Sequence, residues 1–202
     1  MPDYEWETRA ENQGYSLVCG VDEAGRGPLA GPVCVAAVIL PTGTEIPGLN
    51  DSKKLSEKKR EALFDVILQK AVAAQICFAD VSEIEEKNIL GATMAAMARA
   101  VGCLNPAADY ALIDGNRIPG NLEIPAEAVV KGDALCMSIA AASVLAKVSR
   151  DRLMLEYDRQ YPEYGFAAHK GYGTAAHYAA IRRYGICPIH RPSFLKKMKW
   201  EE

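Results

Sequence analysis

The chain has 202 residues, which is the size of one domain or of two small ones. Half of its residues are apolar and 24% are charged, and this composition excludes global disorder because it supplies a hydrophobic core. The formal net charge of −3 argues against a uniformly basic, histone-like nucleic-acid binder.

The first part of the chain predicts a β-hairpin. Residues 1–14 are polar and acidic, so we expect neither a signal peptide nor a transit peptide there. Apolar strands are expected over 16–23 and 31–40, and the Gly- and Pro-rich stretch between them favours an antiparallel pair. The longest apolar run, Val33–Leu40, is far shorter than the ~18 residues of a membrane span, so we expect no membrane contact.

The rest of the chain alternates between helix and strand periodicity, which predicts one α/β domain. In chain order, we first expect a helix capped by Ser56 and ending near Ala73, and then a strand over 75–81. A Ser82–Glu85 capping box should begin the next helix, which ends near Cys103 and is followed by strands over 110–114 and 128–131. The last two helices are expected from Asp133 to before Pro162, and over 177–184, where Thr174 caps the helix and Gly185 ends it. The tail, 191–202, is expected to be partly ordered at best.

Four acidic residues lie at strand ends or at a helix start. Asp22 and Glu23 end the first strand, Asp114 ends the strand YALID, and Asp133 begins the long helix. Sites form at strand ends in open α/β sheets, and carboxylates buried there need a compensating cation. Oxygen ligands without a matching His or Cys cluster suit Mg²⁺ or Mn²⁺. Asp22 and Glu23 would share one site only where Gly25 breaks the strand.

Each acid also has a simpler interpretation. Asp133 could be a helix N-cap, Asp114 a turn residue, and the Asp22–Glu23 pair a partner of Arg26 in an ion pair. The coincidence of all four acids at such positions favours a shared metal site.

Glycine-rich and basic segments near these acids are candidates for contacts with nucleic acid. Gly25 and Gly27 would let the backbone approach a sugar or phosphate closely, and Arg26 between them offers a forked donor. Lys53 and Lys54 precede a predicted helix and could reach phosphates. The alternatives are a tight hairpin turn and two solvated lysines.

Further candidates follow in the C-terminal part. Ser143, Lys147 and Arg150 have i, i+4, i+7 spacing and share one face of the long helix. Lys170 and Tyr172 lie in the loop HKGYGT, where an aromatic ring beside cations is typical of a base- or sugar-stacking platform. The alternatives are a solvated helix face and a tyrosine that packs over a neighbouring loop. The segments at 190–191 and 196–200 add basic and aromatic character.

The cysteines and histidines form no metal-binding pattern. Six cysteines occur singly in apolar segments without a CxxC motif, which is typical of reduced, buried thiols in a cytoplasmic protein. His177 is expected at the surface or in a helix cap rather than as a metal ligand.

The net charge averages two unlike parts of the chain. Residues 1–146 contain 12 Lys and Arg against 20 Asp and Glu, a net charge of −8, whereas residues 147–202 contain 11 against 6, a net charge of +5. We therefore expect metal ions at the acidic part and contacts between phosphates and the basic part, with release of counterions.

Five blocks, in order along the chain, resemble bacterial ribonuclease HII (type 2 ribonuclease H) over about 17–194: VDEAGRGPLAGP, DSKKLSEKKR, LIDG, VKGDALCMSIAAASVLAKVSRD and HKGYGT. The resemblance implies a ribonuclease H-like fold in a single domain, with a mixed central sheet flanked by helices and a small helical C-terminal part from about 160 to 202. It implies an endonuclease that cuts the RNA strand of RNA–DNA hybrids and incises 5′ of ribonucleotides in duplex DNA.

The resemblance also implies roles for the candidate residues. Its catalytic acids, which would hold two Mg²⁺ or Mn²⁺ ions and leave 5′-phosphate and 3′-hydroxyl ends, correspond to Asp22, Glu23, Asp114 and Asp133. The loop that senses the 2′-hydroxyl corresponds to Gly25, Arg26 and Gly27, and the tyrosine that stacks on the following sugar corresponds to Tyr172. Further expected substrate contacts are Lys53, Ser143, Lys147 and Lys170. We expect a monomer.

Two other functions stay open at this point. Another metal-dependent nuclease of the same fold would need neither the glycine-rich turn nor the tyrosine loop. A non-catalytic nucleic-acid binding module would have no use for four acids that repel phosphate in the absence of metal.

Overall fold

The computed structural model describes residues 1–196 and 198, and these form a five-stranded mixed sheet between helices. The strands are β1 (Val18–Ala24), β2 (Val33–Ile39), β3 (Ala73–Ala79), β4 (Tyr110–Asp114) and β5 (Ala126–Val129). Their order across the sheet is β3-β2-β1-β4-β5. β1, β2 and β3 are antiparallel neighbours, whereas β4 runs parallel to both β1 and β5. The predicted hairpin and the mixed sheet are confirmed.

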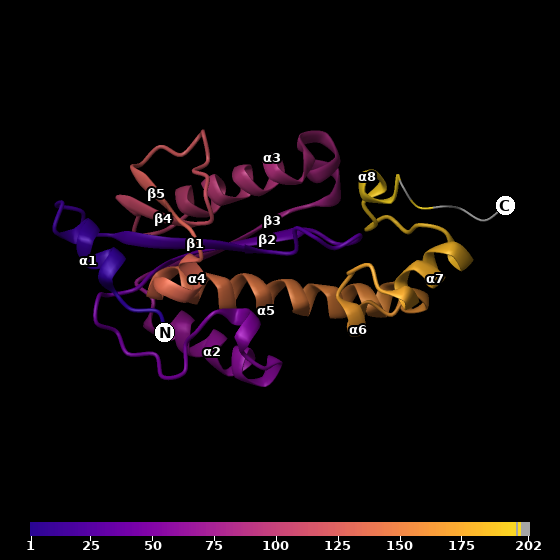
Figure 1. Cartoon of the computed structure of the whole chain (residues 1–202), viewed down its shortest axis with the longest axis horizontal. Helices are drawn as coiled ribbons and strands as arrows, with labels where there is room; N and C mark the ends of the chain where they lie inside the picture. The colour runs from indigo at the N-terminus through magenta and orange to yellow at the C-terminus, as the bar shows by residue number, and fades with distance from the viewer. Residues whose placement is uncertain (197, 199–202) are drawn as a thin grey trace.

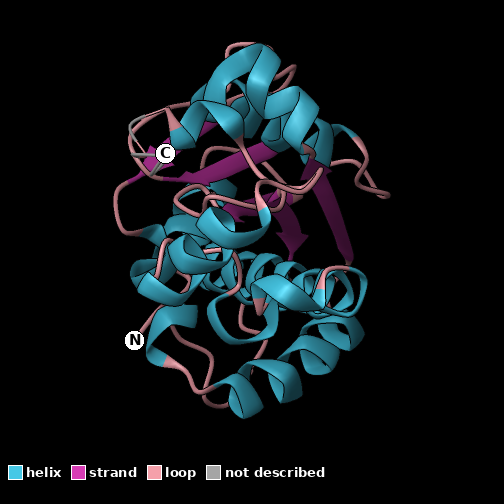
Figure 2. Ribbon diagram, turned by 90° about the vertical axis from the view of Figure 1, so that its right-hand side faces the viewer, coloured by secondary structure: helices cyan, strands magenta, loops and turns pink. Residues whose placement is uncertain are grey.

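Helices cover both faces of this sheet. Figure 1 shows α3 on one face, α2, α4 and α5 on the other, and α6, α7 and α8 beyond one end of the sheet; the view in Figure 2 shows the sheet between the helical layers. The helices are α1 (Glu5–Glu11), α2 (Glu57–Lys70), α3 (Val81–Gly102), α4 (Gly132–Leu135), α5 (Met137–Gln160), α6 (Phe166–His169), α7 (Ala175–Tyr184) and α8 (Pro192–Leu195), with 3₁₀ turns at Ser52–Lys54 and Pro162–Tyr164. In the described part of the chain, no helix combines the length and the apolar character that crossing a membrane requires.

The interior strand β2 is buried on both faces, which explains its unbroken apolar run. Val33 and Val35 belong to the core on the α3 side, while Cys34, Ala36 and Val38 belong to the core formed with α2 and α5. Alternate residues of a strand point to opposite faces, so one strand supplies both cores. A third core joins residues 29 and 30 to the C-terminal helices.

α5 packs unusually close to the sheet because both surfaces are small at the contact. A Cβ atom built on Gly20 of β1 would lie 2.2 Å from the backbone nitrogen of Ile139. The small residues Ala142 and Ala146 of α5 are fully buried. This contact fixes α5 against the strand that carries two of the candidate acids.

Two predicted helix starts differ from the structure, and one helix was not predicted. Asp80, not Ser82, caps α3, because its carboxylate accepts the N–H of Glu83 at 2.8 Å and also a hydrogen bond from the Ser82 hydroxyl. Asp133 does not begin the long helix; it lies in the separate short helix α4, and α5 begins at Met137. The helix α1 in the polar N-terminal segment was not predicted. The caps at Ser56 and Thr174 are confirmed.

Strand limits and the tail also differ in part. β3 and β5 each begin two residues earlier than predicted. The tail was expected to be partly ordered at best, and its described part contains the fully buried Arg191 and the helix α8. Of the basic and aromatic segment predicted at 196–200, residues 197, 199 and 200 lie outside the described residues. All six cysteines are free, as expected, but Cys103 is exposed rather than buried.

Candidate active site

The sheet brings three of the candidate acids to one place. The parallel register pairs Val21 of β1 with Ile113 of β4, so Asp22 and Asp114 lie beside each other at the next step. The backbone N–H of Asp133, in α4, donates a hydrogen bond to Asp114 Oδ1 at 3.4 Å. Asp22 is only 4% exposed. The three carboxyl groups therefore share one buried edge of the sheet, as the sequence pattern predicted.

Glu23 lies next to these acids, and the strand breaks just beyond it, at Gly25, as predicted. β1 continues through Ala24, and Glu23 still pairs with Val35 of β2. The backbone N–H of Glu23 donates to Asp22 Oδ1 at 2.7 Å. The ion pair considered as an alternative is present as well, with Arg26 Nη1 3.4 Å from Glu23 Oε1.

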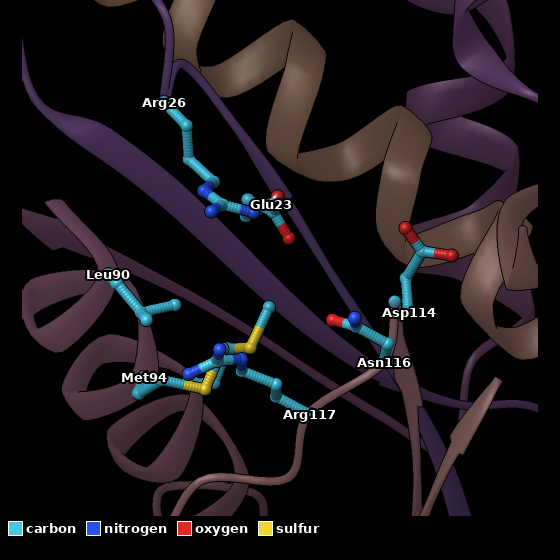
Figure 3. A pocket seen from close by; sticks show the side chains of 9 residues that line it. Glu23, Arg26, Leu90, Met94, Asp114, Asn116 and Arg117 are labelled. Atoms are coloured by element: carbon cyan, nitrogen blue, oxygen red, sulfur yellow. Dashed lines mark hydrogen bonds and ion pairs between the residues drawn. The ribbon is translucent and has the colours of Figure 1, made fainter. Parts of the chain in front are cut away.

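Two hollows flank this carboxylate edge, and Glu23 and Arg26 line both. The α3-side hollow, of about 250 Å³, is also lined by Leu90, Met94, Met97, Asp114, Gly115, Asn116 and Arg117; Figure 3 shows Arg26 reaching toward Glu23, with Asp114 nearby. The α5-side cleft, of about 220 Å³, is also lined by Asp22, Ala24, Gly25, Gly27, Ser52, Lys53, Ser143, Lys147, Arg150 and Tyr172. Most of the predicted site residues thus line one cleft.

Burial and the charges of neighbouring carboxylates raise the pKa values of three of these carboxyl groups. Burial, together with the nearby charges of Glu23 and Asp114, raises the pKa of Asp22 well above its usual value. Burial also raises the pKa of Glu23, although Arg26 opposes this effect. Burial and the charge of Asp133 raise the pKa of Asp114. A group of acids with such raised pKa values is stabilised by any cation that comes between them.

Lys53 supplies one such cation. Its Nζ atom lies 3.3 Å from Asp133 Oδ2, and although partial burial opposes the shift, the charges of Asp133 and Asp22 raise its pKa. The side chain is 79% exposed, so it can also reach a ligand in the α5-side cleft.

The donor set suits a hard divalent cation, because its members are carboxylate oxygens. Within residues 1–196 and 198, however, no three His, Cys, Asp or Glu side chains are grouped closely enough to hold a metal ion as they stand.

A buried arginine, Arg150, packs against the glycine-rich turn 25–27. Gly25 has φ = +96°, and a Cβ atom on it would lie 1.9 Å from Arg150 Nε. Arg150 is fully buried and donates to the carbonyl oxygens of Ala30, Pro32 and Lys170 at 3.0 Å each. The prediction that Arg150 lies on a solvated or phosphate-facing stripe is therefore wrong, because its guanidinium group satisfies backbone carbonyls inside the protein.

A second buried arginine holds the same turn. Arg191 donates to the carbonyl oxygens of Gly25, Arg26 and Pro28 at 2.7 to 3.0 Å and to that of Gly31 at 2.6 and 2.9 Å. Burial, and then the charge of Arg150, lower its pKa to about 9. Sequence analysis missed this role because a single arginine in an aperiodic tail carries no pattern that distinguishes a buried side chain from a solvated one.

Tyr172 lies across the cleft from the turn. Its side chain is 45% exposed, and a Cβ atom on Gly27 would lie 3.7 Å from the tyrosine ring. Lys170 does not join it in lining the cleft, because its Nζ donates to the carbonyl oxygen of Ala167. Ser143 donates to the Ser52 hydroxyl at 2.6 Å, and Lys147 forms an ion pair with Asp151 at 2.7 Å.

His177 departs from its predicted place. It is fully buried rather than at the surface, and its ring bonds to the Tyr172 carbonyl and to His190. Ser52, Asn116 and Arg117 are further lining residues that sequence analysis did not single out.

Comparison with known proteins gives one family. The family model described as Ribonuclease HII matches residues 19–202. The Ribonuclease HII of Ruminiclostridium cellulolyticum is 56% identical over 95% of this chain and 74% of its own length. That of Dechloromonas aromatica is 61% identical over 88% of this chain and 90% of its own.

Solved structures agree on the fold. The ribonuclease H2 of Pyrococcus horikoshii OT3 superposes with a TM-score of 0.72 at 26% identity, covering 88% of this chain and 93% of that one. The Archaeoglobus fulgidus RNase HII, solved in a complex with PCNA, gives 0.74 at 24% identity over 93% and 97%. Bst-RNase HIII in complex with Mn²⁺ gives 0.59 at 20% identity over 87% and 65%.

Proposed function

The chain belongs to the ribonuclease HII family and is a ribonuclease H, and from this premise we propose that it cuts the RNA strand of RNA–DNA hybrids and incises 5′ of single ribonucleotides in duplex DNA. One observation carries the proposal beyond the family name. The buried carboxylate Asp22, the turn 25–27 and the exposed ring of Tyr172 line the same cleft. Groups that would recognise the sugar therefore lie beside an acid that would direct the cut.

We assign the metal ligands to the four acids, Asp22, Glu23, Asp114 and Asp133. Two Mg²⁺ or Mn²⁺ ions held there would supply Lewis-acid stabilisation of the scissile phosphate and a more acidic water. Asp22 is the most central, because the charges of the other three all act on it. The Mn²⁺ bound by the structural neighbour Bst-RNase HIII supports this class of ion.

The remaining cleft residues would bind and orient the nucleic acid. Peptide groups of Gly25 and Gly27 would contact the 2′-hydroxyl, which distinguishes RNA from DNA, and Arg26 would contact a phosphate. Tyr172 would pack against the sugar that follows the ribonucleotide. Lys53, Ser143 and Lys147 line the cleft where neighbouring phosphates would lie. Lys170, outside this lining, would contribute only to the positive charge around it.

We further propose that the protein is cytoplasmic, monomeric and a single domain. Free cysteines suit a cytoplasmic protein, and the complete cleft within one chain suits a monomer. Contacts between residues 29–30 and the C-terminal helices in one core support a single domain with a helical C-terminal part.

The direct test compares three end-labelled duplexes: an RNA–DNA hybrid, a DNA duplex with one ribonucleotide, and an all-DNA duplex of the same sequence. With Mg²⁺ or Mn²⁺ we expect cleavage of the first two, a nick 5′ of the ribonucleotide, and no cleavage with EDTA. Cleavage of the all-DNA duplex at a similar rate would favour another nuclease of this fold. Tight binding without any metal-dependent nick would favour a non-catalytic module.

A further inference from the structure

A cluster of three histidines lies beneath the tyrosine loop, outside both hollows. His177 and His190 are buried, at 0% and 1% exposure, and their Nε2 atoms are 3.1 Å apart. His177 Nδ1 lies 2.9 Å from the carbonyl oxygen of Tyr172. The pair therefore connects the backbone of Tyr172 to the interior of the C-terminal part.

The partners of the two rings determine where their protons lie. The backbone N–H of Cys187 donates to His190 Nδ1 at 2.9 Å, so this nitrogen carries no proton. A neutral His190 then has its proton on Nε2 and donates to His177 Nε2. His177 consequently has its own proton on Nδ1, where it donates to Tyr172. The hydrogen bonds thus run in one direction, from Cys187 through both rings to the Tyr172 carbonyl.

The histidine cluster also contacts the segment that follows the turn 25–27, on the other side of the cleft from Tyr172. Residue 190 forms a β-bridge with Ala30, in the segment that follows the turn 25–27. The neighbouring His169 is stacked on His177 with ring centroids 4.4 Å apart, and its Nδ1 accepts the N–H of Gly171 at 3.2 Å. The backbone on either side of Tyr172 is therefore fixed to the interior that also supports the turn.

We propose that the hydrogen-bonded pair His177–His190 is a positioning device for Tyr172, which sets the ring against the sugar next to the ribonucleotide. The inference rests on the proposed function, because it assigns the pair a purpose only if Tyr172 contacts substrate. Neither histidine touches the nucleic acid or the metal-binding acids in this proposal. Both act through the backbone of the tyrosine loop.

Two substitutions at His177 separate hydrogen bonding from packing. His177→Phe keeps the ring, which packs edge-on against Phe166 at 5.4 Å, but removes the donor to Tyr172. His177→Asn loses the ring but keeps an amide N–H near the Nδ1 position. We expect kcat on the ribonucleotide-containing duplex to fall on the order of tenfold in the Phe variant, with KM within about twofold, and to stay near wild type in the Asn variant. The reverse order, or equal losses in both, would show packing alone and overturn the proposal.

A double-mutant cycle with Tyr172→Ala tests whether the pair acts through the tyrosine. We expect Tyr172→Ala to lower kcat on the order of a hundredfold and His177→Phe to add nothing to it. Additive losses would overturn the proposal. If Tyr172→Ala cuts at the wild-type rate, the proposed role of Tyr172 fails and this inference fails with it. If Tyr172→Ala is slow while His177→Phe is normal, only the inference fails.

The wild-type protein offers a test that needs no variant. In ¹⁵N-histidine NMR spectra at neutral pH, we expect His177 protonated at Nδ1 and His190 protonated at Nε2. A His177 ring protonated at Nε2 would contradict the direction of the hydrogen bonds and overturn the proposal even if the variants fail to fold.

Discussion

Burial gives individual residues of this protein properties that their sequence positions do not reveal. Burial lowers the pKa of both His177 and His190 to about 4, with the charges of His169 and, for His177, of His190 adding to the effect. Tyr164, Phe166 and Cys187 pack around the pair. An unfolded histidine titrates near 6.5, so between that pH and about 4 the unfolded chain binds protons that the folded chain does not.

The protein should therefore lose stability as the pH falls from about 6.5 toward 4. Each histidine contributes a slope of about 1.4 kcal/mol per pH unit in this range, and no slope above it. Denaturant unfolding at pH 7, 6 and 5 measures the effect. Asp22, Glu23 and Asp114 act in the opposite direction, because their pKa values are raised, so the comparison uses the difference between wild type and His177→Asn. If stability depends on pH in His177→Asn with the same slope as in wild type, the lowered pKa of His177 is contradicted.

Residue types at strand ends predicted where the candidate acids lie in the fold, whereas side-chain burial was not predictable. Asp22, Asp114 and Tyr172 lie where their local patterns indicated. Arg150 lines the α5-side cleft, but its guanidinium group bonds to backbone carbonyls inside the protein, and Lys170 lies outside the lining, with its Nζ bonded to the carbonyl of Ala167. Those carbonyls belong to turns whose positions depend on the whole fold, so helical spacing alone gives no information about them.

At the scale of elements, the contact between α5 and β1 fixes the relative position of two elements that line the α5-side cleft. We predict that Gly20→Ala lowers the free energy of unfolding by roughly 3 kcal/mol, because the new Cβ atom would meet the backbone of α5. Gly102→Ala, at the end of α3 with open space around it, is the matched control and should leave stability unchanged or raise it by up to about 1 kcal/mol. Urea unfolding measures both. Equal stabilities would contradict the close contact.

The turn 25–27 depends on an arginine from the far end of the chain. We predict that Arg191→Gln costs roughly 3 kcal/mol of stability, because several buried carbonyls lose their donors, and that it slows incision at a ribonucleotide. Arg191→Lys should rescue neither fully, since an ammonium group cannot reproduce the forked geometry. Arg182→Gln, on the exposed face of α7, is the control and should change stability by less than about 0.5 kcal/mol. Wild-type incision by Arg191→Gln would exclude a role for Arg191 in shaping the turn.

Element types followed from periodicity, but element limits did not. The sheet strands and the long helices were predicted, because apolar spacing reports burial directly. The helix α1 was missed because its buried face includes a glutamate, Glu7, which bonds to the start of α5 instead of packing as an apolar side chain would. The separation of α4 from α5 depends on the extended backbone of Cys136, with φ = −113° and ψ = 130°, which no residue preference signals.

At the scale of the whole molecule, the charge is divided between an acidic part and a basic C-terminal part. We predict that affinity for duplex falls as salt rises, with each neutralised phosphate contributing about −0.9 to the slope of log K against log salt. Lys147→Ala, in the basic part and in the lining of the α5-side cleft, should make this slope less steep by about one unit. Fluorescence anisotropy in Ca²⁺ or EDTA across a salt series measures it. A flat salt dependence would contradict a phosphate-binding role for the basic side.

The central claim is that the acid cluster around Asp22 cuts where the neighbouring turn detects a ribonucleotide. The most direct measurement is single-turnover cleavage of an end-labelled DNA duplex with one ribonucleotide, by wild type and by Asp22→Asn, with the affinity of each for the same duplex. The account predicts one metal-dependent nick 5′ of the ribonucleotide by wild type, no nick by Asp22→Asn, and similar binding by both. A nick by Asp22→Asn at the wild-type rate, or wild-type cleavage at deoxynucleotides alone, would contradict it.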